Sequence, residues 1–400
     1  MKLYAQHGHA PSDKMHRGIE EGFIDGVILS PRYVKPEAAA SLISELRGKR
    51  DDADVLLDPE LYAARYVGGA NAHLRYLEEW PHFIPRRRNE LLVGTAAVDA
   101  SIRSAYEVQT DLRCTHLIAP SVYVSSSLDS IEAAIAIMFM TRARQVADDM
   151  GLQGRVFATL SAGRDALVDR QNLLAFLNAL TVIDPRPHGV YLLVGAAASD
   201  AESGTARSEI MVPEVVAGWM LLNYSLALNG LEVLNGCSDI LTPLLGVAGG
   251  SAGATGWWTN LQVFSMGRYL RGKPGGRAPL KRYLSKALLN RITVNEREAF
   301  AEVVPEIMNG LLTDSMYVGR EPERTEEAIQ SWDAIASLNA ETAADDVSSG
   351  LTRFKELIGQ AVGLYQKLRE AGFSERYESN MDYLQALSDS ITVFKELAEL

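Results

Sequence analysis

Eight short apolar segments, most of them followed by a helix-like pattern, constrain the fold of this chain more than any other feature. They are residues 2–6 (KLYAQ), 26–30 (GVILS), 54–58 (DVLLD), 116–120 (HLIAP), 155–160 (RVFATL), 189–194 (GVYLLV), 231–235 (LEVLN) and 252–256 (AGATG). Their near-continuous apolar character is typical of strands that are buried on both faces of a parallel sheet. Eight strand–helix units predict an α/β fold, a closed (β/α)₈ TIM barrel, with an open doubly wound sheet as the alternative.

Helical patterns occupy most of the segments between these strands. We expect helices over residues 36–47, 128–150, 168–183, 212–229 and 239–247. The first begins with Pro and Glu, as a first helical turn often does, and a serine cluster at 125–127 can supply the N-cap of the second.

Two parts of the chain do not belong to the predicted strand–helix units: an insertion within the barrel and a C-terminal region. Residues 1–272 form the expected barrel, with an insertion between strands three and four at about 59–115. Residues 273–400 form an expected helical C-terminal region. Its helical patterns cover residues 303–312, 325–338, 351–371 and 381–400.

The composition excludes several classes of protein. Of the 400 residues, 47% are apolar and 22% are charged, which is typical of a globular chain and excludes an intrinsically disordered one. No apolar run is long enough to span a bilayer, and no secretory signal is visible at the N-terminus. Only two cysteines occur, Cys114 and Cys237, so we expect no disulfide scaffold and a cytoplasmic location.

A barrel of this kind places its functional residues at the C-terminal ends of the strands. Polar or aromatic residues at these positions are His7, His9, Ser30, Arg32, Asp58, Glu60, Ser121, Tyr123, Ser161, Arg164, Asn235, Ser238, Asp239, Thr255, Trp257, Trp258 and Asn260. Two tryptophans in a polar mouth suit a flat or aromatic ligand. The alternative is that some of these residues only cap helices, for which Ser121, Ser161 and Asp239 are suitable types.

The pair His7 and His9 raises the question of a metal site. Alternate residues of a strand point the same way, so both imidazoles could face one ion. Two histidines without further ligands on later strands are too few for a transition metal, and we expect neither bound zinc nor another cofactor. A metal-assisted hydrolase built on His7 and His9 remains an alternative.

The glycine-rich segment at residues 235–257 resembles the phosphate site that barrels often form after their last two strands. Asp239, at the start of the expected helix, argues against an anion there because its charge would repel one.

Charge is distributed unevenly along the chain. The formal net charge is −12, yet no acidic residue occurs between Ile240 and Asn295. The same stretch contains eight cations: Arg268, Arg271, Lys273, Arg277, Lys281, Arg282, Lys286 and Arg291. Such a segment suits a polyanion such as nucleic acid. The competing interpretation is a basic surface that docks the acidic C-terminal helices or a partner protein.

Three stretches carry a distant resemblance to the tRNA-guanine transglycosylase barrel. They are residues 22–36 (GFIDGVILSPRYVKP), residues 55–63 (VLLDPELYA) and the segment NGCSDILTPLLGVAG that leads into strand eight. The resemblance implies that Asp58 occupies the place of a catalytic aspartate that engages the base. The family's late-strand nucleophilic aspartate and its cysteine-rich zinc site have no counterparts here, so the resemblance implies a sister group with altered chemistry.

Taken together, these patterns predict a barrel that acts on, or binds, a nucleotide base or nucleic acid at its C-terminal mouth. Asp58, His7 and His9 are the candidate catalytic residues, and Ser30, Arg32, Asn235, Trp257 and Trp258 are the candidate ligand-binding residues. A non-catalytic barrel that binds nucleic acid or a protein partner is the main alternative.

Overall fold

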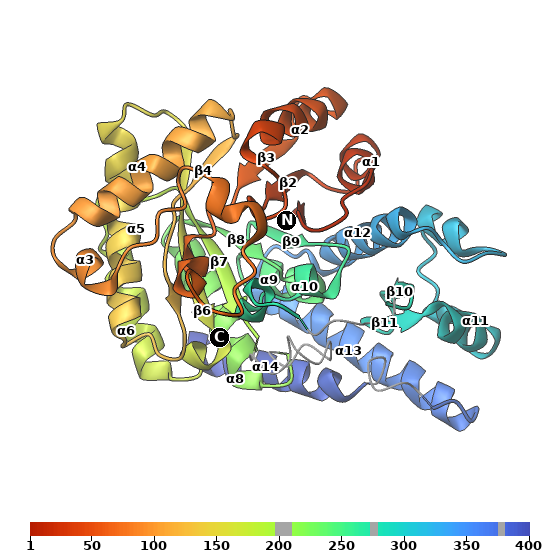
Figure 1. The fold of residues 1–400 in the computed structure, drawn as a ribbon. Helices are drawn as coiled ribbons and strands as arrows, with labels where there is room; N and C mark the ends of the chain where they lie inside the picture. The colour runs from red at the N-terminus through yellow and green to blue at the C-terminus, as the bar shows by residue number, and fades with distance from the viewer. Residues whose placement is uncertain (197–209, 273–278, 375–380) are drawn as a thin grey trace.

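The computed structural model describes residues 1–196, 210–272, 279–374 and 381–400, and it has the barrel architecture that the sequence predicts (Figure 1). The strands are β1 (Lys2–Gln6), β2 (Gly26–Leu29), β3 (Asp54–Leu57), β4 (His116–Ile118), β5 (Tyr123–Val124), β6 (Arg155–Gly163), β7 (Gly189–Gly195), β8 (Glu232–Gly236) and β9 (Ala252–Thr255). All pair in parallel, in the order β3-β2-β1-β9-β8-β7-β6-β4, with β5 beside β6. Each predicted strand is present to within a few residues, and β5 is an addition.

The two ends of this sheet meet, so that the barrel is nearly closed. Thr115, directly before β4, donates its backbone N–H to the carbonyl of Val55 in β3, at 2.9 Å. The Thr115 hydroxyl also accepts a hydrogen bond from the N–H of Val55, at 3.0 Å. These bonds replace a regular ladder between β3 and β4.

Helices follow most of the strands and cover the barrel. They are α1 (Lys14–Glu20), α2 (Pro36–Lys49), α3 (Arg88–Leu92), α4 (Ala96–Asp111), α5 (Ile131–Asp149), α6 (Arg170–Thr181), α8 (Pro213–Leu228), α9 (Thr242–Val247) and α10 (Thr259–Gln262). The serine cluster at 125–127 does not cap α5, because Ser130 accepts the hydrogen bond from the backbone N–H of Ala133. Short 3₁₀ turns are η1 (Leu61–Tyr66), η2 (Arg75–Glu79), η3 (Arg164–Leu167), η4 (Asp239–Leu241) and η5 (Met266–Tyr269).

The C-terminal region is mainly helical and packs against one side of the barrel (Figure 1). It consists of β10 (Arg282–Ser285), β11 (Asn290–Thr293), α11 (Val294–Val303), η6 (Pro305–Ile307), η7 (Leu312–Tyr317), α12 (Arg324–Thr342), α13 (Val347–Glu370) and α14 (Asp382–Ala398). α12 contacts α1 and α9, and α14 runs along α8. The predicted helix over residues 303–312 is wrong, since Pro305 ends the helical run and Gly310 has a positive φ of 69°. The antiparallel β10–β11 hairpin was not predicted.

No helix in the described parts of the chain is both long and apolar enough to cross a membrane.

Candidate functional site

Side chains from opposite sides of the barrel meet at its C-terminal end. The parallel register aligns Gln6 of β1 with Ile28 of β2, and Ile28 with Leu56 of β3. Because alternate strand residues share a face, Gln6 and Asp58 belong to the same inward-facing set. The hydroxyl of Tyr191, in β7, reaches across the barrel and donates to Asp58 Oδ2 at 3.1 Å. The interior of the barrel therefore contains a polar centre.

Asp58 is buried and is held by three donors. Its Oδ1 accepts the backbone N–H of Glu60 at 3.0 Å. Its Oδ2 accepts the hydroxyls of Tyr62, at 2.7 Å, and Tyr191. Gly236 permits this arrangement, because a Cβ at that position would lie 2.8 Å from the Tyr191 ring and hydroxyl. Hydrogen bonds of this number stabilise the ionised carboxylate.

Glu60 lies beside Asp58, and one of its two carboxylate oxygens has no hydrogen-bond partner in the described structure. It is 2% exposed, and its Oε1 accepts a short bond of 2.6 Å from the hydroxyl of Ser30. Its Oε2 is buried without a hydrogen-bond partner among the described residues. The backbone of Glu60 is in the left-handed region, with φ of 50°, which is uncommon for a residue with a side chain. A strained backbone and a buried oxygen without a hydrogen-bond partner are both typical of functional positions.

Burial and mutual repulsion govern the protonation of this pair. Burial raises the pKa of Asp58, and the hydrogen bonds from Tyr62, Glu60 and Tyr191 act in the opposite direction. Burial, together with the charge of Asp58, raises the pKa of Glu60 to about 7, against the hydrogen bond from Ser30. Two neighbouring carboxyl groups in a low-dielectric site share one proton near neutral pH. We place that proton on Glu60, because Asp58 accepts three hydrogen bonds and Glu60 only one.

Aromatic rings form a wall around the pair. Tyr62 makes an edge contact with Phe264 at a centroid distance of 5.3 Å, and another with Tyr269 at 6.1 Å. The guanidinium of Arg32 lies over the rings of Tyr33, at 5.0 Å, and Tyr269, at 5.3 Å. Such a wall shields the carboxyl pair from water.

Several further polar atoms in this part of the barrel are buried without a hydrogen-bond partner in the described structure: Gln6 Oε1, Ser121 Oγ and Ser161 Oγ. The two serines therefore do not cap helices, contrary to the alternative raised from the sequence. An unsatisfied buried group costs free energy, so a cluster of them calls for an explanation such as a ligand.

The two N-terminal histidines have different surroundings. His7 is 1% exposed, and its Nδ1 accepts the backbone N–H of Ser30 at 3.3 Å. Burial lowers the pKa of His7 to about 4, so its ring is neutral at physiological pH. His9 is exposed, and its Nδ1 lies 3.4 Å from a guanidinium nitrogen of Arg75. No group of three or more His, Cys, Asp or Glu side chains with metal-binding geometry occurs among the described residues.

Of the predicted ligand-binding residues, Ser30 lies at the carboxylate pair and Arg32 at its aromatic wall. Arg32 donates from Nε and a terminal nitrogen to the carbonyl of His73, at 3.0 and 2.9 Å, and so anchors the insertion. Asn235 points away from the barrel centre into a buried amide network. It exchanges hydrogen bonds with Asn223 at 2.7 and 3.0 Å and accepts the indole N–H of Trp219 at 2.7 Å.

The two predicted stacking residues bind the loop that follows β1. The indole N–H groups of Trp257 and Trp258 both donate to the carbonyl of His9, each at 2.9 Å. Lys14 lies over the Trp257 ring at 5.6 Å, and Arg324 lies over Trp258 at 5.3 Å. Both rings therefore already have cationic neighbours from α1 and α12.

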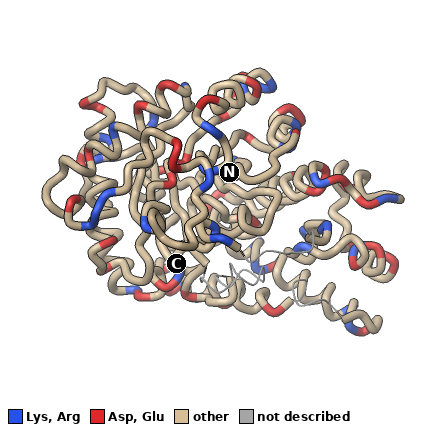
Figure 2. Tube along the Cα trace, in the orientation of Figure 1, with Lys and Arg blue, Asp and Glu red and all other residues tan. Residues whose placement is uncertain are grey.

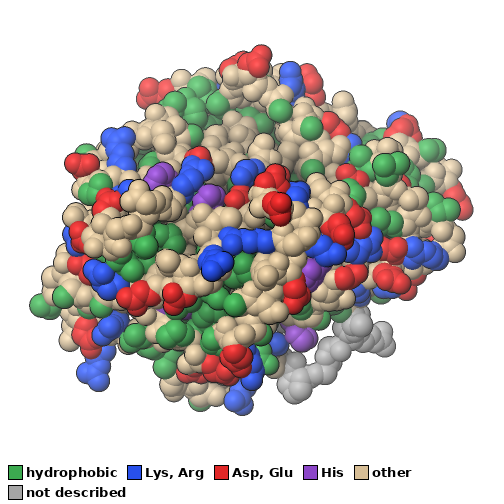
Figure 3. All heavy atoms as spheres, turned by 90° about the horizontal axis from the view of Figure 1, so that it is seen from above, with side chains coloured by type: hydrophobic (Ala, Val, Ile, Leu, Met, Phe, Trp, Pro, Cys, Tyr) green, Lys and Arg blue, Asp and Glu red, His purple; other side chains and the backbone are tan. Residues whose placement is uncertain are grey.

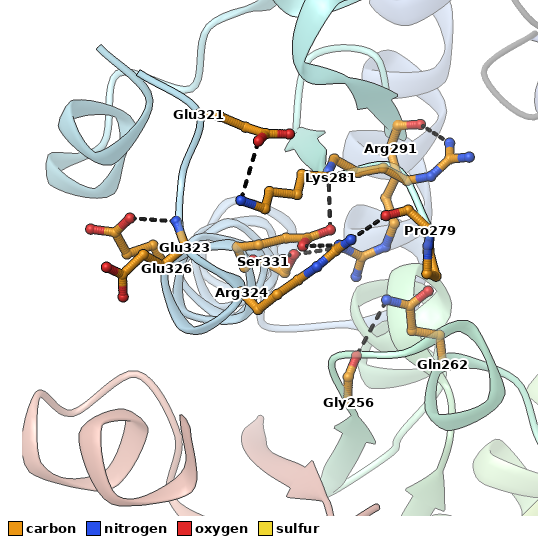
Figure 4. A network of polar contacts seen from close by, with 12 residues as sticks. Gly256, Gln262, Pro279, Lys281, Arg291, Glu321, Glu323, Arg324, Glu326 and Ser331 are labelled. Carbon is orange, nitrogen blue, oxygen red and sulfur yellow. Dashed lines mark hydrogen bonds and ion pairs between the residues drawn. The ribbon is translucent and has the colours of Figure 1, made fainter. Parts of the chain in front are cut away.

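The basic segment is brought against acidic residues of the C-terminal region (Figure 4). Lys281 pairs with Glu321 at 3.4 Å, and Lys286 pairs with Glu341. Arg282 donates its backbone N–H to Glu327 at 3.0 Å, and Arg271 is exposed. Lys273 and Arg277 lie outside the described residues. Seen from above the view of Figure 1, basic and acidic side chains are interspersed over the surface (Figure 3).

Two arginines of this segment turn inward. Arg268 packs on the Phe264 ring at 5.2 Å and donates to the carbonyl of Val263 at 3.0 Å. Arg291, in β11, binds the buried Asp239 at 2.6 Å, and Asp239 also accepts the hydroxyl of Thr255 at 2.6 Å. Asp239 thus connects the turn after β8 to the C-terminal hairpin.

The opposite, N-terminal end of the barrel is closed by a second polar cluster. Asp54 accepts hydrogen bonds from Lys2 and from the Tyr4 hydroxyl, both at 2.7 Å, and lies 3.4 Å from His116. Although burial opposes its ionisation, these partners hold the pKa of Asp54 well below its usual range. Polar groups at this end of a TIM barrel generally serve stability.

Tyr62, Tyr191 and Gln6 were not among the residues that the sequence predicted for the mouth of the barrel. A tyrosine in the middle of an otherwise apolar strand is the signal that marks Tyr191, and the alternation of β1 marks Gln6. Glu60 stood among the mouth residues, but only the three-dimensional structure distinguishes its free oxygen from the saturated carboxylate of Asp58.

Fold and site define a (β/α)₈ barrel with a buried pair of carboxyl groups at the C-terminal end of its third strand. No protein-family model matches the chain, and no curated protein is significantly similar to it.

Proposed function

We propose that this barrel is an enzyme that binds a nucleotide base at its C-terminal mouth and exchanges a proton with it through Glu60. The observation that carries the proposal is the buried Oε2 of Glu60, an unpartnered carboxyl oxygen on a group whose pKa of about 7 matches general acid–base catalysis. A carboxyl that is protonated near neutral pH can donate to a ring nitrogen, and after transfer it can accept a proton back.

Further residues around Glu60 suit a planar polar ring. The free Oε1 of Gln6 can accept a hydrogen bond from an amino group or a ring N–H. Tyr62 and Tyr269 supply aromatic surface beside it. The resemblance to the tRNA-guanine transglycosylase barrel supports the same class of ligand. In this proposal Asp58 is a positioning residue: its charge keeps the proton on Glu60, and its hydrogen bonds hold Tyr62 and Tyr191.

The test is binding of free purine and pyrimidine bases to the full-length protein, measured by isothermal titration calorimetry. We expect one base to bind and Glu60→Gln to weaken it by about tenfold or more, the scale of a lost hydrogen bond to a charged or acidic group. Glu78→Gln, an exposed glutamate on the same insertion, is the matched control and leaves binding unchanged.

Binding of no base, or equal affinity in Glu60→Gln and in the parent protein, would overturn the proposal. Incubation of the base that binds best with its nucleoside or oligonucleotide then shows which glycosidic or exchange reaction follows.

A further inference from the structure

An open pocket lies next to the carboxylate pair and is lined by arginines. Its volume is about 460 Å³. The residues that line it are Leu61, Tyr62, Ala64, Arg65, Arg86, Arg88, Leu91, Val122, Tyr123, Ser125, Glu132 and Ile135. They come from η1, from the insertion that follows it, from the β4–β5 segment and from α5. We call this hollow the arginine pocket.

The arginine pocket has an excess of positive charge. It contains three arginines and one glutamate, a formal sum of +3 − 1 = +2. Arg88 is compensated, because it forms an ion pair with Glu132. Among the described residues, no carboxylate lies within ion-pair distance of Arg65 or Arg86, and the Nε of Arg86 is buried without a hydrogen-bond partner. The basic run before α3 is visible as a blue stretch at the left of Figure 2.

Aromatic contacts orient one of these arginines. The guanidinium of Arg65 lies 5.6 Å from the ring centres of both Tyr66 and Tyr123. Tyr123 is itself fixed, since its hydroxyl lies over the backbone of Gly163 and Gly195, where any side chain would collide with it. Stacking of this kind orients the guanidinium N–H donors of Arg65 before a ligand binds. The side chain therefore loses less conformational entropy on binding.

Tyr62 connects the arginine pocket to the proposed base site. Its hydroxyl binds Asp58, and its side chain also lines the arginine pocket. Arg65 follows three residues later in η1, a 3₁₀ turn, in which residues i and i+3 lie on the same face about 6 Å apart along the axis. The two sites are therefore neighbours along one short element.

We propose that the arginine pocket binds the phosphate group of the ligand whose base lies at Glu60, so that the substrate is a nucleotide or a nucleic acid rather than a free base. The proposal rests on the proposed function for the identity of the ligand as a whole. Its physical basis is separate: two uncompensated guanidinium groups present forked N–H donors that match phosphate oxygens.

The test uses inorganic phosphate as the probe of the arginine pocket, measured by calorimetric titration of the full-length protein at low ionic strength. We expect saturable binding that weakens as NaCl is added, because salt screens exposed charges. The double variant Arg65→Met/Arg86→Met should lose about tenfold or more in affinity, since charge-assisted hydrogen bonds are the stronger class. Arg87→Met is the matched control, an exposed arginine of the same run that does not line the pocket, and keeps the parent affinity.

A second variant changes affinity in the opposite direction. Glu132→Gln removes the one acidic group of the pocket and releases Arg88 from its ion pair, so phosphate should bind more tightly. Phosphate that does not bind, or that binds the double variant as tightly as Arg87→Met, would overturn the proposal. Free bases used as a second probe separate the two claims. Phosphate binding without base binding refutes the proposed function alone, and base binding without phosphate binding refutes only the arginine pocket.

Discussion

At the scale of single residues, the polar centre depends on an asymmetry between two adjacent carboxyl groups. Asp58 has three hydrogen-bond donors, whereas Glu60 has one and keeps an unpartnered oxygen. The sequence pointed to Asp58 as a candidate catalytic residue because it ends a predicted strand and, in the resemblance to the transglycosylase barrel, takes the place of the catalytic aspartate. We propose Glu60 for that role instead, because its Oε2 has no hydrogen-bond partner in the described structure and is therefore available to a ligand.

This arrangement predicts how stability depends on pH. The pKa of Glu60 is about 7 in the folded protein and about 4.5 when unfolded, so the folded state binds the extra proton between these values. The free energy of unfolding therefore falls as pH rises from about 4.5 to about 7. In Glu60→Gln this dependence is removed, and at pH 8 the variant should be more stable than the parent by on the order of 1–3 kcal/mol.

Chemical denaturation of both proteins at a series of pH values measures this difference. The histidines have the opposite effect. Burial lowers the pKa values of His7 and His82 to about 4, so their contribution raises stability as pH increases toward 6.5. Both are present in parent and variant, so the difference between the two curves reports the titration of the Asp58–Glu60 pair. A constant difference across the whole range would contradict the assigned pKa.

At the scale of elements, the β10–β11 hairpin and the turn after β8 are joined by the Arg291–Asp239 ion pair. The side chain of Asp239 is 3% exposed and that of Arg291 is 13% exposed, so water screens the pair weakly. Arg291 also donates to the hydroxyl of Ser331 in α12, at 2.5 Å. One arginine thus connects the barrel, the hairpin and a C-terminal helix. Figure 4 shows Arg291 together with Ser331 of α12.

Loss of this arginine should therefore destabilise the protein. Arg291→Met removes the cation from a buried carboxylate and should lower the free energy of unfolding by about 3 kcal/mol, the scale of a broken buried pair. Lys281→Met is the matched control, because Glu321, its partner, is 64% exposed, and an exposed pair contributes about 1 kcal/mol or less. Urea titration of both variants gives the comparison. Equal losses in the two would show that the Arg291 pair is no stronger than a surface pair.

At the scale of the whole molecule, the barrel could be predicted from the sequence, whereas the contacts within the candidate site could not. The strands were predictable because doubly buried parallel strands are short apolar runs, and β7 (GVYLLVG) is buried along its whole length. The prediction of a helix over residues 303–312 was wrong, because it rested on the apolar pattern and took no account of Pro305, which ends the helical run. Docking of the basic segment on the acidic C-terminal helices was one of two interpretations of the sequence. The individual partners of Lys281, Lys286 and Arg291 could not be predicted, since they lie 40 to 55 residues away and only tertiary packing brings them near.

The most direct test of the account is a carbon-13 NMR titration of the aspartate and glutamate side-chain carboxyl groups in the parent protein, Glu60→Gln and Asp58→Asn. We predict one carboxyl resonance that titrates near pH 7 in the parent. It is absent from Glu60→Gln. In Asp58→Asn the pKa of Glu60 falls but stays above its ordinary value, because burial, the larger cause of the shift, remains when the neighbouring charge is removed. A parent protein in which every carboxyl group titrates at ordinary acidic pH, or a resonance near pH 7 that survives in Glu60→Gln, would contradict the proposal that Glu60 is the acid–base group of this barrel.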